Sequence, residues 1–192
     1  MLKKNTKPLV FIIFLVTIFI LFELYFHFGR FFMCKIYFHK CVKLAKEKNK
    51  KVMVIGDPCV GSGLNCSRNI FYSHGDVTID LFGCNQCDKM DINNISSWKK
   101  YNSNEYVVFE TATLSFSKDI NSVLEEIKRV SGGDFYSTGG TRSLTWILFG
   151  HKLYSKNYPE NIKICLYPYT PNKKYFMIYD IYQHKFRYIP FK

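Results

Sequence analysis

The stretch from Leu9 to Phe28 constrains this chain most, because its 20 residues are apolar except for Thr17, Glu23 and His27. As an α-helix this stretch is about 30 Å long, which equals the thickness of the hydrocarbon core of a bilayer. The residues that follow it are bulky, whereas a cleaved signal peptide ends at small residues. We therefore predict a single transmembrane helix that is retained as a membrane anchor.

The positive charge of the chain is concentrated beside this apolar stretch. Residues 1–51 carry a net charge of +9, and residues 52–192 carry only +3. A basic segment next to an apolar helix favours an anionic membrane surface as its partner, and we expect no nucleic-acid partner. Three lysines precede the helix and eight basic residues follow it by position 51. The positive-inside rule therefore predicts that the globular part is cytosolic.

These patterns divide the chain into four parts. We expect a short basic N-terminus over 1–8, a transmembrane helix over 9–28, a basic juxtamembrane linker helix over 29–50 and an α/β domain over 51–192. Aromatic residues of the linker are expected at the level of the lipid headgroups.

From residue 51 onward, short apolar runs alternate with helical patterns, which is typical of an α/β domain with a mostly parallel sheet. The clearest helix is predicted over 119–130, where Gly132 and Gly133 end an amphipathic pattern. A partly buried helix is predicted over 142–154. We predict strands over 52–55, 76–81, 105–110, 134–138, 162–168, 175–182 and 185–190, and the last two are expected to form an antiparallel hairpin at one edge of the sheet.

A glycine-rich loop follows the first of these strands. Gly56, Gly61 and Gly63 allow the backbone to turn sharply and to approach a ligand closely. Ser62 stands where the phosphate-binding P-loop needs a lysine, so triphosphate chemistry is not expected. The third glycine of the dinucleotide fingerprint is also missing.

The order of these motifs resembles class I S-adenosylmethionine-dependent methyltransferases over residues 50–140. The resemblance is carried by the segment Val52–Gly63, by Asp80 at the end of the second strand, by Asp91 after a short third segment, by the strand at 105–110, and by the sequence Arg-Val-Ser-Gly-Gly at 129–133. It implies a Rossmann-like three-layer sandwich, with a mostly parallel sheet and antiparallel C-terminal edge strands, after one transmembrane helix.

The resemblance also implies a site for S-adenosylmethionine. The cofactor-binding candidates are Gly56, Asp57, Gly61, Gly63, Asp80 and Asp91. In that family Asp80 would accept hydrogen bonds from the ribose hydroxyls, and Asp91 would lie by the adenine amino group. The catalytic candidates at the end of the fourth strand are Glu110, Thr111 and Thr113, and the methyl acceptor is unknown.

Two alternatives stay open at this point. Val54 occupies the position of the acid that the family carries before its first glycine, and Asp57 follows the glycine instead. A binding or structural membrane protein that keeps the fold without catalysis is therefore the alternative function. The cysteines at 59, 66, 84 and 87 also allow a metal or redox module, although the spacing of the first two is wide for a zinc site.

Overall fold

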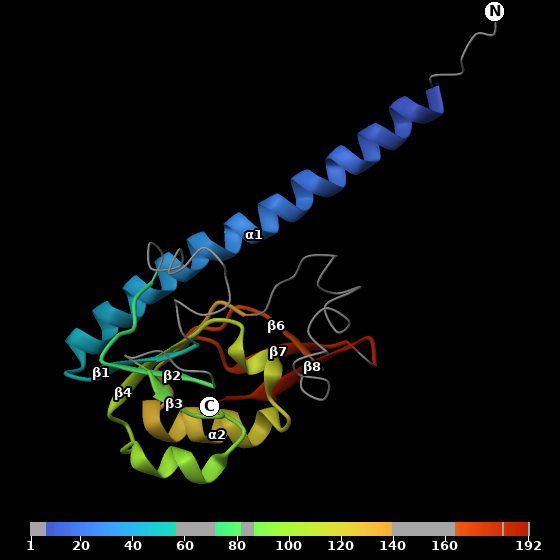
Figure 1. The fold of residues 1–192 in the computed structure, drawn as a ribbon. Coiled ribbons are helices and arrows are strands. Elements are labelled where there is room, and N and C mark those ends of the chain that lie inside the picture. The colour runs from blue at the N-terminus through green and yellow to red at the C-terminus, as the bar shows by residue number, and fades with distance from the viewer. Residues whose placement is uncertain (1–6, 57–71, 82–86, 140–163, 182, 192) are drawn as a thin grey trace, which may run out of the picture.

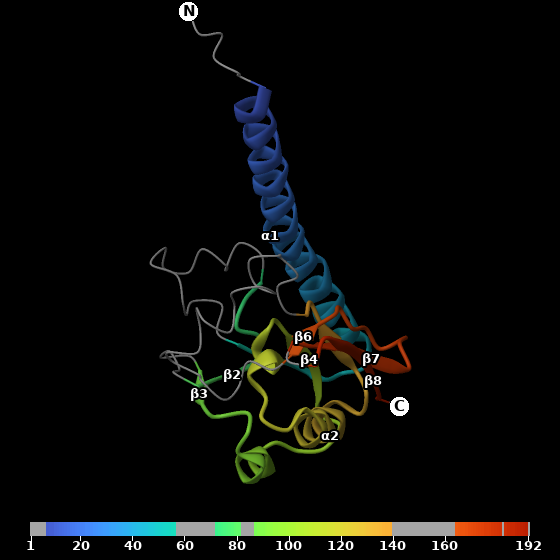
Figure 2. The ribbon, with the colours of Figure 1, turned by 90° about the vertical axis from the view of Figure 1, so that its right-hand side faces the viewer.

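The computed structural model describes residues 7–56, 72–81, 87–139, 164–181 and 183–191, and all structural statements concern these residues. Helix α1 runs without interruption from Lys7 to Glu47. Its first part has side chains exposed to the surroundings, and it projects away from the rest of the chain in both views (Figures 1 and 2). The helix is long and apolar enough to cross a membrane.

A five-stranded parallel sheet follows the helix, with the order β3-β2-β1-β4-β5. Its strands are β1 (Lys51–Ile55), β2 (Val77–Asp80), β3 (Asp88–Lys89), β4 (Tyr106–Glu110) and β5 (Phe135–Ser137). The central strands β1 and β4 are apolar except for Lys51 and Glu110 at their ends, because both faces of the sheet are covered. Alternate residues of β1 show this: Val52 and Val54 pack with α1, whereas Met53 and Ile55 belong to the core on the opposite face.

Three helices complete this part: α2 (Ile120–Ser131) and the short 3-10 helices η2 (Ile95–Lys100) and η3 (Thr113–Phe116). Helix α2 lies on the side of the sheet opposite α1 (Figure 2). The side chain of Asp119 caps its N-terminus by accepting from the backbone N–H groups of Asn121 and Ser122. Gly132 ends the helix in the left-handed conformation, with φ 65°. The predicted helix at 119–130 is thus confirmed, with its boundary shifted by one residue.

The last three strands form a separate antiparallel sheet with the order β6-β7-β8. They are β6 (Ile164–Leu166), β7 (Tyr175–Asp180) and β8 (Lys185–Pro190). The hairpin of β7 and β8 is confirmed by their antiparallel register. Most side chains of β8, the last strand of this sheet, are exposed.

The expected position of this hairpin at the edge of the parallel sheet needs correction. A single antiparallel bridge, Ser137 to Tyr169, joins β5 to the chain before β7. The two residues exchange both backbone hydrogen bonds, each 2.9 Å long. The next such pair would join Phe135 to Pro171, and proline has no N–H to donate. In the other direction, the N–H of Tyr167 donates to Met177 of β7 instead.

Candidate functional site

The carboxyl ends of the parallel strands bring most of the described candidate residues to one edge of the sheet. Gly56 follows β1, Asp80 ends β2, Asp91 follows β3 and Glu110 ends β4. Chain order reverses between β1 and β4, because β2 and β3 lie on one side of β1 whereas β4 and β5 lie on the other. In open parallel sheets, ligands bind outside the carboxyl ends of the strands at such a reversal.

Gly56 lies at this reversal in a conformation that only glycine adopts without strain, with φ 100°. A Cβ atom at this position would stand 2.4 Å from the Oγ1 atom of Thr113. The Thr113 hydroxyl also donates to the carbonyl of Ile55, at 3.3 Å. The backbone N–H of Gly56 donates to the carbonyl of Ile79, at 2.9 Å, so the ends of β1 and β2 are held together. The first glycine is therefore required by the close approach of η3.

The two candidate carboxylates occupy neighbouring strands. Asp80 pairs with Lys89 in the register of β2 and β3, and its carbonyl accepts from the N–H of Met90. Its side chain is half-buried. The exposed carboxylate of Asp91 accepts from both the backbone N–H and the side-chain amide of Asn93, each at 2.9 Å. A pair of carboxylates on adjacent strand ends is able to accept hydrogen bonds from the hydroxyl and amino groups of a nucleoside.

Glu110 has no exposed atoms and serves internal contacts. One carboxylate oxygen accepts from the hydroxyl of Ser137 at 2.5 Å, and the other accepts from the N–H of Leu114 at 3.0 Å. Burial raises the pKa of this carboxyl group, against the opposing effect of these two hydrogen bonds. Glu110 thus joins the ends of β4 and β5 to the start of η3. No distinctive motif surrounds Ser137, so its contact with Glu110 was not predicted from the sequence.

Thr111 faces the other side of the sheet and contacts α1. Its hydroxyl accepts from the Arg30 guanidinium at 3.2 Å and lies 3.5 Å from the Cys34 sulfur. Cys34 also contacts the hydroxyl of Thr138, after β5. The prediction of a linker helix missed this contact, although the spacing of Cys34, Phe38, Cys41 and Ala45 places four apolar residues on one face of a helix. All four are buried against the sheet.

The sequence Arg-Val-Ser-Gly-Gly at the end of α2 has a structural role. The Arg129 guanidinium donates to the carbonyls of Trp98 and Tyr101, each at 2.9 Å. It also pairs with Glu126 at 2.7 Å. Arg129 therefore fixes η2 against α2 and lies away from the carboxyl edge of the sheet.

Several candidates fall outside the described residues. Asp57, Gly61 and Gly63 are among them, and so are three of the four cysteines considered for a metal site. The fourth, Cys87, is half-buried. Within the described part of the chain, no group of three or more His, Cys, Asp or Glu residues is placed to hold a metal ion.

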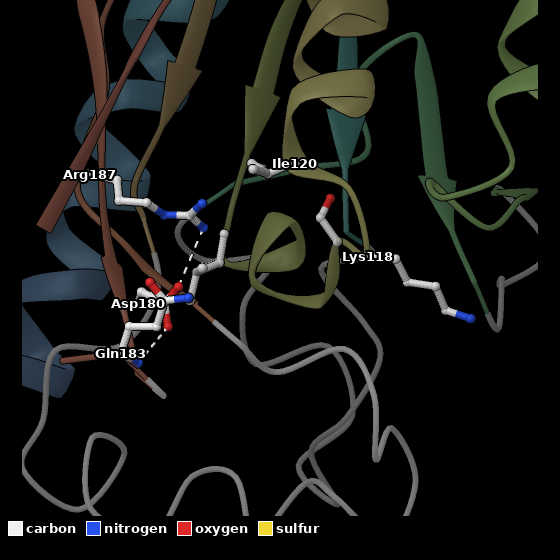
Figure 3. A pocket seen from close by; sticks show the side chains of 7 residues that line it. Lys118, Ile120, Asp180, Gln183 and Arg187 are labelled. Atoms are coloured by element: carbon white, nitrogen blue, oxygen red, sulfur yellow. Dashed lines mark hydrogen bonds and ion pairs between the residues drawn. The ribbon is translucent and has the colours of Figure 1, made fainter. Parts of the chain in front are cut away.

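A hollow of about 290 Å³ lies where the start of α2 meets the second sheet (Figure 3). Its charged wall is an ion pair between Asp180 and Arg187, 3.6 Å apart, and Asp180 also accepts from the N–H of Gln183. The Lys118 side chain extends away from this pair (Figure 3). The hollow is lined by Ser117, Lys118, Ile120, Ile164, Asp180, Gln183 and Arg187, and thus by none of the candidate site residues.

Comparison with known proteins leaves the family open. No family model, curated protein or solved structure matches this chain. Function is therefore inferred from the geometry of the carboxyl edge of the sheet. The main elements of this edge are a glycine at the strand reversal and two carboxylates on the adjacent strands.

Proposed function

We propose that this protein is a membrane-anchored S-adenosylmethionine-dependent methyltransferase with a cytosolic globular domain. One observation carries the proposal: Gly56, Asp80 and Asp91 follow or end three neighbouring strands at the carboxyl edge of a parallel sheet.

The strand order supports a Rossmann-like fold. The order β3-β2-β1-β4-β5 equals that of the first five strands in doubly wound dinucleotide-binding sheets. Helices on both faces, α1 on one and α2 on the other, make three layers. In this arrangement the ligand crosses the ends of β1 and β4, and its ribose meets an acid at the end of β2.

The residues at this edge suit the parts of the cofactor. We assign Gly56, with Gly61 and Gly63 that follow it in the sequence, to the methionine part of the cofactor, as the resemblance to the family implies. Asp80 is the acceptor for the ribose hydroxyls, and Asp91 is the acceptor for the adenine amino group. Asp57 supplies the carboxylate for the cofactor's ammonium group. Transfer then requires an acceptor held in line with the methyl group, which is an effect of positioning.

Cofactor titration tests the proposal directly. The full chain in detergent micelles is titrated with S-adenosylmethionine and with its demethylated product, and the heat of binding is measured. The full chain is needed because residues 34–45 of α1 complete the core on one face of the sheet. Binding of both compounds is expected, and binding of neither overturns the proposal.

Two variants at opposite ends of β2 show whether the binding depends on the site or on the fold. Asp80→Asn removes the charged acceptor and is expected to weaken binding about tenfold or more, since hydrogen bonds to charged groups contribute roughly 1.5–3 kcal/mol. The matched control is Asp76→Asn, just before the opposite end of the strand, where the carboxylate accepts from the N–H of Val52 at 2.7 Å. The control is expected to bind like the unaltered chain. Equal weakening in both variants would assign the effect to the fold rather than to the site.

The second candidate function is a binding or structural membrane protein without catalysis. It is favoured by the burial of Glu110 and Thr111, whose polar atoms serve contacts within the protein. Thr113, the remaining candidate at this strand end, has its side chain close to Gly56. Cofactor binding without methyl transfer to any acceptor would support this function.

A further inference from the structure

Helix α1 runs antiparallel to the strands of the parallel sheet, and its contacts show this step by step. Arg30 contacts Thr111, just past the carboxyl end of β4, at 3.2 Å. Cys41, three turns later, contacts the carbonyl of Val107 near the start of the same strand. Lys48, just past the end of the helix, pairs at 2.6 Å with Asp134, which directly precedes β5. The residues before Arg30 therefore extend beyond the carboxyl edge of the sheet, on the side of the candidate site.

The distance between this edge and the apolar stretch is small. Phe28, the last residue of the apolar stretch, precedes Arg30 by two positions, or about 3 Å along a helix. The headgroup layer on each side of a bilayer is roughly 5–7 Å deep. Because α1 is unbroken from Lys7 to Glu47, no hinge within it allows the domain to swing away.

The outer side of α1 supports the same placement. Phe28, Phe32 and Ile36 recur every four residues, and their exposed fractions are 59%, 61% and 46%. This stripe continues past the apolar stretch, on the helix whose Cys34 and Phe38 are buried against the sheet. An exposed apolar stripe that continues a membrane helix is stabilised by contact with the membrane interface.

From this geometry, which rests on the proposed function, we propose that the methyl acceptor is a lipid held in the bilayer, with its reactive group at headgroup depth. The carboxyl end of β4 is the part of the site nearest α1, so it receives the acceptor. Asp80 lies two strands further away, roughly 10 Å at the usual strand spacing, and leaves the nucleoside side of the site open to water.

The reaction that this arrangement supports is a direct displacement. A lone pair on the lipid headgroup forms a bond to the methyl carbon while the carbon–sulfur bond breaks. The electron pair of that bond stays on sulfur, which becomes a neutral thioether. A proton on the acceptor atom passes to water. No oxidant or reductant is required.

The experiment changes the distance between site and membrane without touching the site. Four alanines inserted between Phe28 and Gly29 add about one helical turn and raise the domain by roughly 6 Å. The matched control inserts the same residues between Lys7 and Pro8, on the other side of the apolar stretch. Each full chain is placed in vesicles of lipids extracted from its native membrane, with S-adenosylmethionine that carries a tritiated methyl group. Tritium in the organic extract and cofactor affinity are both measured.

We expect tritium in the lipid fraction for the unaltered chain and for the control. The insertion after Phe28 is expected to lower this transfer at least tenfold, with cofactor affinity within twofold of the unaltered value. Tritium in protein alone, equal transfer with both insertions, or bound cofactor with no transfer would overturn the lipid acceptor. Absence of cofactor binding in the unaltered chain would instead overturn the proposed function.

A second measurement is independent of the cofactor. Phosphatidylethanolamine with a photoreactive diazirine on its headgroup is included in the vesicles, and its adducts are mapped by mass spectrometry. Adducts are expected on residues 111–118, at the carboxyl edge, and not on residues 102–105, at the opposite edge. Adducts spread equally over both edges would overturn the orientation.

Discussion

Replacement of Phe38 by alanine tests whether the second half of α1 belongs to the core of the domain. The Phe38 ring is only 9% exposed, and it packs edge-on against Phe109 of β4 with 5.5 Å between ring centroids. It also lies 6.3 Å from the ring of Tyr72. Truncation of a buried phenylalanine costs about 3–5 kcal/mol. Since the ring keeps some exposure, we expect a loss of about 3–4 kcal/mol in the free energy of unfolding.

The matched control is Phe32→Ala on the same helix, because Phe32 is 61% exposed and lies away from the sheet. We expect it to change the free energy of unfolding by less than about 0.5 kcal/mol, as exposed positions do. The full chain is unfolded in detergent micelles, by urea and by heat, and followed by near-ultraviolet circular dichroism. For a domain of this size, the loss in Phe38→Ala corresponds to a melting temperature lower by roughly 10 °C. Equal effects of the two replacements, or a loss below about 1 kcal/mol for Phe38→Ala, would refute the reasoning.

Three further predictions concern polar contacts, each measured by unfolding of the full chain in micelles. Asp119→Ala removes the cap of α2 and is expected to cost about 1 kcal/mol, whereas Asp119→Asn, which keeps a capping oxygen, should cost much less. Asp134→Ala removes the carboxylate partner of Lys50, whose side chain is only 10% exposed, and is expected to cost about 3 kcal/mol. Lys48→Met removes the other partner of Asp134, a lysine whose side chain is 47% exposed, and should cost under about 1 kcal/mol. Folding raises the pKa of Glu110, so the stability that this group contributes is present below the unfolded pKa and is lost as pH rises through the folded pKa. Glu110→Gln should therefore reduce the fall in the free energy of unfolding with rising pH. An unchanged pH profile of stability would contradict this assignment.

The parallel sheet and α2 could be predicted because their signals are local. The continuous apolar run of β1 and the periodicity between Asp119 and Gly132 each arise within a few neighbouring residues. Both elements also end at residues that favour termination, such as glycine in the left-handed conformation. Patterns of this kind follow from the geometry of a single helix or strand.

Contacts between distant parts of the chain could not be predicted in the same way. Arg30 and Thr111 are 81 positions apart, and nothing in either neighbourhood indicates the other. The lysines around Ala45 indicated a linker on the membrane surface, and they obscured the apolar face that packs on the sheet. The ladder between β5 and the chain before β7 stops at one bridge, because Pro171 has no N–H on one side and the N–H of Tyr167 donates to β7 on the other.

The exposed strand β8 has a consequence for how copies of this protein meet. It is paired with β7 on one side, and its other side is an open edge of the second sheet in the described part of the chain. If the helix anchors the domain, copies diffuse in two dimensions and collide edge to edge far more often than free copies do. Lys185 places a charge on this edge strand, and Pro190 removes a donor at its end. Such residues oppose pairing between β8 strands of neighbouring molecules.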